Sequence, residues 1–180
     1  MSYTSTASLT DLAERIRHAR SIVCTAHEKP DGDATGSVIA MVRALGAQHH
    51  IQGWLLGAVP PPMRALAGDT PWQHIPDATA IPDGEEPDLI IVLDTGAWSQ
   101  LKPISEWLSA RSDRVIGLDH HASGDDVAPA RVVDVCAASC TMVVLRLLDA
   151  LECEIDEQVA TPLFAGLATD TGWFRQANGN

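Results

Sequence analysis

The chain has 180 residues, of which 46% are hydrophobic, and a formal net charge of -12 from 24 acidic and 12 basic side chains. This length and composition are typical of one globular domain with a sizeable core. We expect no membrane span, because no apolar run approaches roughly 18–20 residues, and no long nucleic-acid duplex as a partner, because no basic run offers the patch that grips one.

In chain order the pattern of apolar residues predicts an α/β fold in which short strands alternate with helices. The expected elements are a helix at Leu9–Ala19, a strand at Ser21–Ala26, a helix at Asp33–Leu45, a strand at His50–Leu56, a short helix at Met63–Ala67, a short strand near Trp72–Ile75, a strand at Leu89–Leu93, a helix at Ile104–Ala110, strands at Arg114–Leu118 and Ala130–Val135, and helices at Ser139–Leu151 and Gln158–Ala168.

These elements predict a three-layer Rossmann-like domain with a mostly parallel sheet of about five strands and helices on both faces. Thr10-Asp11 is expected to cap the first helix, and Gly46 is expected to end the second. The polar stretch 1–10 lacks the pattern of a secretory signal, so we expect a cytoplasmic protein.

Four cysteines occur, and none belongs to a C-x-x-C pair; they are Cys24, Cys136, Cys140 and Cys153. We expect free, buried thiols, as in a reducing compartment. A zinc site or a disulfide is the alternative.

Aspartate and histidine residues follow several of the predicted strands. Because the carboxyl ends of parallel strands meet at one edge of a sheet, these side chains are expected to gather there. The residues are His27, Asp31 and Asp33 after the first strand, Asp94 after Leu89–Leu93, Asp119, His120 and His121 after the run 115–118, and Asp170 after the last helix.

Carboxylates and imidazoles in such a group favour a pair of divalent cations. Mn²⁺ accepts both ligand types, and Mg²⁺ or Co²⁺ are alternatives. Two ions about 3.5–4 Å apart commonly share a bridging carboxylate, and Gly32 is expected to permit a backbone turn between Asp31 and Asp33. Each element also has a structural alternative, such as an ordinary turn at Pro30-Asp31-Gly32; their joint occurrence favours a metal site.

The motifs His27-x-x-Pro30-Asp31-x-Asp33, Asp94, Asp119-His120-His121 and Thr169-Asp170-Thr171-Gly172 resemble those of the DHH phosphoesterase family (RecJ-like). The similarity spans about residues 20–176. Within the family, Asp33-Ala34, the stretch Val133–Thr141 and Trp173-Phe174-Arg175 are most similar to the NrnA-type branch, whose members are bifunctional oligoribonucleases and phosphatases of 3′-phosphoadenosine 5′-phosphate.

The resemblance implies a role for each residue. His27 and Asp31 would hold one cation, Asp33, His120 and Asp170 the other, and Asp94 would bridge the two. His121 would be catalytic, contacting the phosphate or protonating the leaving oxygen, and Asp119 would orient the adjacent histidines. Arg175 is a candidate phosphate contact, with a plain solvated arginine as the alternative.

The implied activity is Mn²⁺-dependent hydrolysis of phosphodiester or phosphomonoester bonds by a two-metal-activated hydroxide. Short oligonucleotides (nanoRNA) or 3′-phosphoadenosine 5′-phosphate are the expected substrates. Alternatives are another hydrolase of the family (a pyrophosphatase, an exopolyphosphatase or a cyclic-dinucleotide phosphodiesterase) or a non-catalytic module that binds metal or nucleotide. The complete ligand set favours an enzyme.

Two features depart from the NrnA-type pattern. Members of that branch continue into a second, DHHA1-type domain with a glycine-rich substrate motif, whereas residues 1–180 are expected to form a single DHH domain without it. Lys29 stands where an asparagine is common, with little expected effect. The physiological substrate, the direction of cleavage and the oligomeric state are not determined by the sequence.

Overall fold

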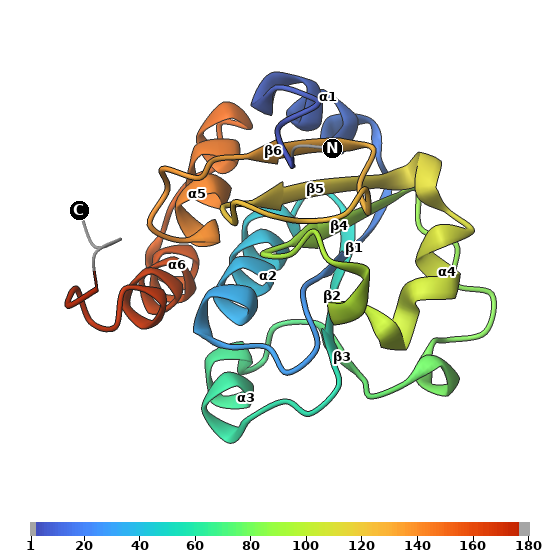
Figure 1. The fold of residues 1–180 in the computed structure, drawn as a ribbon, viewed down its shortest axis with the longest axis horizontal. Coiled ribbons are helices and arrows are strands. Elements are labelled where there is room, and N and C mark those ends of the chain that lie inside the picture. Colours follow the sequence, from blue (N-terminus) through green and yellow to red (C-terminus); the bar gives the residue numbers. More distant parts are fainter. Residues whose placement is uncertain (1–2, 177–180) are drawn as a thin grey trace.

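A computed structural model of the protein describes residues 3–176 (Figure 1). Within them, six parallel strands form one sheet in the order β3-β2-β1-β4-β5-β6. The strands are β1 (Ser21–Thr25), β2 (His50–Leu56), β3 (Trp72–Ile75), β4 (Leu89–Leu93), β5 (Val115–Asp119) and β6 (Ala130–Val133). The α/β fold is confirmed, and the sheet has six strands rather than about five because the short β3 pairs with β2.

Helices cover both faces of this sheet, which confirms the three layers. The helices are α1 (Leu9–His18), α2 (Gly32–Leu45), α3 (Pro61–Ala67), α4 (Ser105–Ser109), α5 (Cys140–Ala150) and α6 (Glu157–Asp170). One buried apolar cluster joins α1, α2, α5 and α6 to the sheet, and a second joins Leu101, Ile104 and Leu108, around α4, to the other face. Figure 1 shows α6 lying outside α2 and α5.

Three details at the helix ends differ from the predictions. Ser8, not Thr10-Asp11, is the N-cap of α1: its hydroxyl accepts the Asp11 N–H at 3.2 Å, and Asp11 in return accepts the Ser8 N–H at 2.8 Å. Gly46 follows α2 as predicted, but with a right-handed φ of -62°. Asp170 is the last residue of α6 instead of following the helix.

The four cysteines are free, as predicted. Cys24 and Cys140 are buried, but Cys136 is exposed and Cys153 is half-buried, so the expectation of four buried thiols was wrong for these two. The described residues contain no helix that is long and apolar enough to cross a membrane.

The strand order reverses between β1 and β4, and such a switch point predicts a crevice at the carboxyl ends of the strands. From β1 the chain passes first to β2 on one side, and later to β4 on the other. Helices that connect such strands diverge at this point, and ligands bind in the resulting crevice outside the carboxyl ends of the strands. The segments that leave β1, β4 and β5 carry most of the predicted metal ligands.

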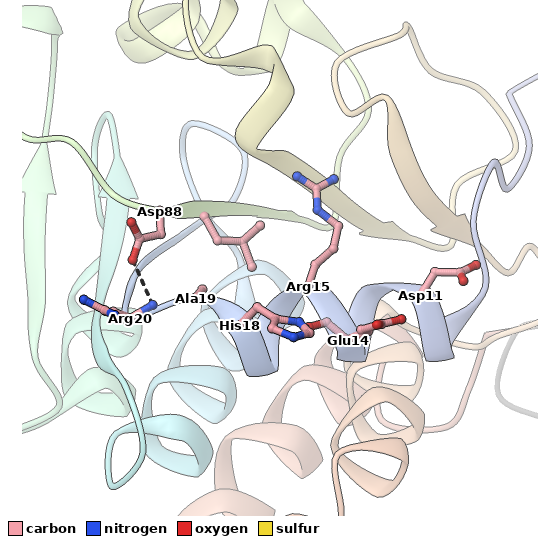
Figure 2. Close-up of a pocket in the computed structure, with 8 residues that line it drawn as sticks. Asp11, Glu14, Arg15, His18, Ala19, Arg20 and Asp88 are labelled. Carbon is pink, nitrogen blue, oxygen red and sulfur yellow. Dashed lines mark hydrogen bonds between the residues drawn. The ribbon is translucent and has the colours of Figure 1, made fainter.

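At the amino ends of the strands, Asp88 joins two neighbouring strands by hydrogen bonds. Its carboxylate accepts the N–H groups of Arg20 (2.8 Å) and Ser21 (3.1 Å), which ties the start of β1 to the start of β4 and holds the pKa of Asp88 below its usual value. Figure 2 shows the surface groove here, between α1 and Asp88. It lies at the amino ends of the strands, far from the crevice where the acidic and histidine motifs meet.

Candidate metal centre

Three overlapping groups of potential ligands lie at the carboxyl ends of the strands, and two of these groups share no residue. His27, Asp31 and Asp94 form one group, and Asp33, His120 and Asp170 form the other; in each group the ligand atoms lie within 4.8 Å of one another. These groups bring together the residues to which the family resemblance gives metal-binding roles, and those roles stay a prediction.

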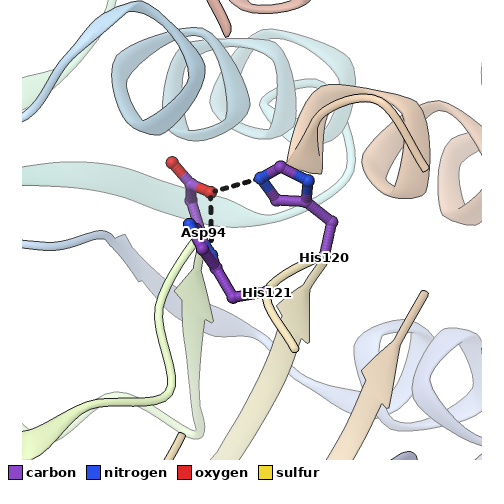
Figure 3. A group of neighbouring side chains, drawn as sticks. All are labelled: Asp94, His120 and His121. Atoms are coloured by element: carbon purple, nitrogen blue, oxygen red, sulfur yellow. Dashed lines mark ion pairs between the residues drawn. The ribbon is translucent and has the colours of Figure 1, made fainter. Parts of the chain in front are cut away.

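Asp94 lies between the two groups. Its Oδ2 is 3.6 Å from His27 Nε2, and its Oδ1 is 3.5 Å from His120 Nε2 (Figure 3). Both separations are longer than an ordinary hydrogen bond and suit two ligands around an ion. One carboxylate therefore presents one oxygen to each group, which is the arrangement of a bridging ligand.

The backbone at Asp94 directs this carboxylate into the crevice. Asp94 has a left-handed φ of 60° immediately after β4, and its N–H donates to the Leu118 carbonyl at 3.0 Å. Aspartate tolerates this conformation better than most residues. The side chain is only 3% exposed, so its charge depends on the groups around it.

Backbone carbonyls fix the orientation of both histidines. His27 Nδ1 lies 3.0 Å from the Glu28 carbonyl, and His120 Nδ1 lies 3.2 Å from the Ala137 carbonyl. When the ring is neutral and its Nδ1–H donates to the carbonyl, the lone pair is on Nε2. In each case Nε2 is the atom that faces Asp94.

Asp31 and Asp33 come from the N-terminal turn of α2. Asp31 is the N-cap, whose Oδ1 accepts the N–H groups of Asp33 and Ala34, both at 3.0 Å. Its side chain is 60% exposed, so it can serve as cap and ligand together. Asp33 is buried, and its Oδ2 lies 3.6 Å from His120 Nε2.

Asp33 also caps α5, a role that sequence analysis missed. Its two oxygens accept the N–H groups of Cys140 (2.6 Å) and Thr141 (2.9 Å), while the N-cap residue Ser139 makes no side-chain cap bond. The partners are more than a hundred residues apart in the chain. A cap supplied by another helix has no local sequence signal.

Glycines let α2 and α6 approach closely. A Cβ at Gly36 would lie 2.4 Å from the Pro162 carbonyl oxygen, and one at Gly32 would lie 2.1 Å from Thr169 Oγ1. Gly32 does not have a positive φ, so the expectation that it permits a turn was wrong; it permits the close approach. This packing brings Asp33 and Asp170 to the same side of the crevice.

Asp170 completes the second group from the end of α6. Its Oδ2 lies 3.8 Å from His120 Nε2, and its side chain is 26% exposed. Burial raises the pKa of Asp170. Arg175 lies in the turn that follows, with an exposed side chain, so its contact with substrate stays a prediction.

His121 forms the third group with Asp94 and His120, whose ligand atoms also lie within 4.8 Å of one another, but it is bonded to Asp119. Asp119 Oδ1 lies 2.7 Å from His121 Nδ1 and accepts the N–H groups of His120 (2.8 Å) and His121 (3.2 Å). The His121 Nδ1 is 3.8 Å from Asp94 Oδ1 (Figure 3), so its nearer partner is Asp119. The imidazole is 53% exposed, which leaves Nε2 for a substrate.

Comparison with known proteins assigns the family. The model described as DHH family, N-terminal domain, matches residues 21–167. The chain belongs to the DHH family. This DHH chain is 32% identical over 164 residues to the bifunctional oligoribonuclease and PAP phosphatase NrnA of Thermus thermophilus, covering 87% of this chain and 45% of that protein.

Solved structures agree with this DHH fold. An exopolyphosphatase-related protein from Bacteroides fragilis matches with a TM-score of 0.87 and 25% identity, over 96% of this chain and 52% of that one. Exonuclease RecJ bound to manganese matches with a TM-score of 0.52 and 16% identity, over 89% and 47%, and shows the fold alone. The DHH chain thus spans about half the length of the relatives that it matches.

Burial and neighbouring charges shift the pKa values of several groups in the candidate centre. Burial lowers the pKa of His27 and His120, but the groups around them outweigh burial and raise both values to about 9. Asp94 acts on both rings, the Glu28 carbonyl and Asp31 act also on His27, and Asp33 and Asp170 act also on His120. Burial and the Asp94 charge raise the pKa of Asp33 above its usual value. Burial also raises the pKa of Asp94, but His120 and His27 outweigh it and hold the value below the usual one. Protons on two histidines therefore offset part of the negative charge.

The DHH centre also contains buried polar atoms that a cation would satisfy. Among the described residues, Asp94 Oδ1 and His120 Nε2 are buried and have no hydrogen-bond partner. Native structures rarely leave such atoms unsatisfied unless an ion or water belongs there. The oxygen and imidazole donors fit a divalent transition metal better than calcium or a thiolate-loving ion.

Proposed function

We propose that the protein is a phosphoesterase that needs two divalent cations, with Mn²⁺ as the ion that suits its ligands. Its proposed substrates are short oligonucleotides and 3′-phosphoadenosine 5′-phosphate. The observation that carries the proposal is the Asp94 carboxylate, which faces His27 with one oxygen and His120 with the other. The substrate class is supported by the name of the Thermus relative.

In this proposal His27 and Asp31 hold one ion, Asp33, His120 and Asp170 hold the second, and Asp94 is shared. When bound, two divalent ions make water a stronger acid and neutralise charge on the phosphoryl oxygens. The chain carries a net charge of -12, so an anionic substrate would otherwise meet a negative surface. Arg175 is proposed as a supplementary phosphate contact.

His121 is proposed to handle the proton of the leaving group. With Nδ1 donating to Asp119 at 2.7 Å, a proton on Nε2 points away from that carboxylate. The hydrogen bond to Asp119 raises the pKa of His121, which keeps the imidazole protonated nearer to neutral pH. Donation from Nε2 would then convert a poor alkoxide leaving group into an alcohol.

A second candidate substrate is polyphosphate. It is favoured by the structural likeness to the exopolyphosphatase-related protein, which extends over 96% of this chain. The same ligands would serve, because a phosphoanhydride also places charged phosphoryl oxygens at the ions.

The test is hydrolysis of a dinucleotide, of 3′-phosphoadenosine 5′-phosphate and of short polyphosphate by the purified chain, with Mn²⁺ and after chelation. Chelator-sensitive release of mononucleotide or phosphate from either of the first two supports the proposal. Exclusive release from polyphosphate would favour the second candidate. Failure on all three, together with no Mn²⁺ bound in calorimetry, would contradict both.

A further inference from the structure

The segment before α1 is held along the edge strand β6. Ser5 Oγ accepts the Val133 N–H at 2.8 Å and donates to the Val133 carbonyl at 3.1 Å. Thr6 N–H donates to the Arg131 carbonyl at 3.0 Å, and Thr6 Oγ1 accepts the Arg131 N–H at 3.0 Å. These bonds satisfy the unpaired side of β6, and they place Tyr3, two residues before Ser5, beside Asp119 at the end of β5.

Tyr3 reaches from this segment to the back of the candidate centre. The side chain is buried, and its hydroxyl donates to Asp119 Oδ2 at 2.9 Å. A Cβ at Gly96 would lie 2.1 Å from the hydroxyl oxygen, and one at Gly124 would lie 2.7 Å from the ring. The Arg131 guanidinium lies 5.2 Å from the ring centroid. Two glycines and a cation thus form a slot that fits this ring.

The Tyr3 hydroxyl donates to Asp119 Oδ2, the oxygen that makes no hydrogen bond to His120 or His121. Oδ1 already takes the Nδ1 of His121 and the backbone N–H groups of His120 and His121. With Oδ2 taken by Tyr3, the carboxylate plane is fixed from both sides. Burial and the nearby Asp119 raise the pKa of the Tyr3 hydroxyl far above its usual value, so it remains a donor.

We infer that Tyr3 is a positioning residue that acts through Asp119 to hold His121 in its working orientation. This inference rests on the proposed function, in which His121 serves the leaving group. Tyr3 touches neither the substrate nor the proposed ions, so its removal changes turnover and leaves metal binding in place. Partners that orient the residues of a metal centre are typically worth 10–100-fold in affinity or activity.

The first arm of the test is a double-mutant cycle with Tyr3→Phe and His121→Ala. Tyr3→Phe keeps the ring in its slot and removes only the hydroxyl. We expect it to lower kcat by about 10-fold, with KM and the number of bound Mn²⁺ ions unchanged, and to have no further effect in the His121→Ala background. Equal effects in both backgrounds, or a loss of bound Mn²⁺, would overturn the inference.

Ser5→Ala is the matched control in the same segment. It removes the hydrogen bonds to Val133 but leaves the Tyr3 hydroxyl and Asp119 intact. Its kcat is expected to equal that of the unmodified protein, with thermal unfolding reporting any loosening of the segment. A kcat loss as large as that of Tyr3→Phe would assign the effect to the segment and not to the hydroxyl.

The second arm does not depend on activity. The imidazole ¹⁵N shifts of His121, assigned by their loss in His121→Ala, report which ring nitrogen carries the proton at a pH where the ring is neutral. We expect the Nδ1–H form in the unmodified protein and in Ser5→Ala, and a shift toward Nε2–H in Tyr3→Phe. Unchanged ¹⁵N shifts in Tyr3→Phe would overturn the inference even if hydrolysis is observed; absent hydrolysis with the shift present would contradict only the proposed function.

Discussion

Asp94 is the central residue of the candidate centre, because it lies between the two groups of ligands. It combines a left-handed backbone, a buried carboxylate and one oxygen toward each group of ligands. Its surroundings contain two further carboxylates, Asp33 and Asp170, in the second group alone. Such a concentration of buried negative charge is costly without a cation, which supports the proposal that the site binds one.

Asp94→Asn is expected to lower Mn²⁺-dependent hydrolysis by at least about 100-fold, because a neutral amide is a poor bridge between two ions. The fold should persist, since asparagine tolerates the left-handed conformation and the change removes a buried charge. The measurement is kcat with Mn²⁺, beside thermal unfolding of the metal-free protein. The exposed Asp113→Asn controls for the change in net charge; unaltered activity and Mn²⁺ dependence in Asp94→Asn would refute the bridging role.

His121→Ala is expected to slow turnover more than it weakens metal binding. The reason is geometric: its Nδ1 is engaged by Asp119 at 2.7 Å, whereas the proposed ligand histidines face Asp94 with Nε2. Loss of a general acid costs roughly 10²–10⁴-fold in kcat. Calorimetry with Mn²⁺ is the companion measurement, and the loss of one bound ion would place His121 among the ligands instead.

At the scale of elements, the contact of α2, α5 and α6 assembles half of the centre. Asp33 of α2 caps α5, and the glycine surface of α2 receives α6. A cap is typically worth about 1 kcal/mol. The same contacts that stabilise the helices therefore set the positions of Asp33 and Asp170.

Gly36→Ala is expected to destabilise the protein although alanine favours helices. The new Cβ would lie 2.4 Å from the Pro162 carbonyl oxygen, and relief of such overpacking costs about 1–3 kcal/mol. Displacement of α6 would also weaken Mn²⁺ binding through Asp170. Urea unfolding and Mn²⁺ calorimetry measure the two effects, with Thr161→Ala on the exposed face of α6 as the control. Stability equal to the unmodified protein would show that the helices are not packed this closely.

At the scale of the whole molecule, metal binding and protonation are coupled. His27 and His120 have pKa values of about 9 without metal, so both carry a proton at neutral pH. A ligand imidazole must be neutral. In the proposed centre, protons therefore compete with the ions below about pH 9, and the apparent affinity is expected to fall as the pH falls.

We expect Mn²⁺ binding at neutral pH to release protons, and the apparent affinity to rise with pH until it levels off near pH 9. Calorimetry in two buffers with different ionisation enthalpies counts the released protons. The exposed His18→Gln controls for histidines outside the crevice. Binding without proton release would mean that these two histidines are not ligands or are already neutral.

The sequence by itself determined much of the element pattern. The bounds of His50–Leu56, Trp72–Ile75 and Leu89–Leu93 agree with the structure, because apolar runs and periodicity are local signals. The motif residues at strand ends also indicated the candidate ligands, since parallel strands must bring their carboxyl ends together. Their individual roles remain predictions.

Only the tertiary structure decided which partners complete the centre. The Asp33 cap on α5, the packing of α6 against Gly36 and the Tyr3 bond to Asp119 join residues that are more than a hundred positions apart. None of these contacts has a local sequence pattern. A glycine required for close helix packing cannot be told from a turn glycine by sequence, and nothing in the polar segment around Tyr3 indicates that its side chain is buried. Such contacts depend on the packing of distant elements, and the sequence shows them only once the chain is folded.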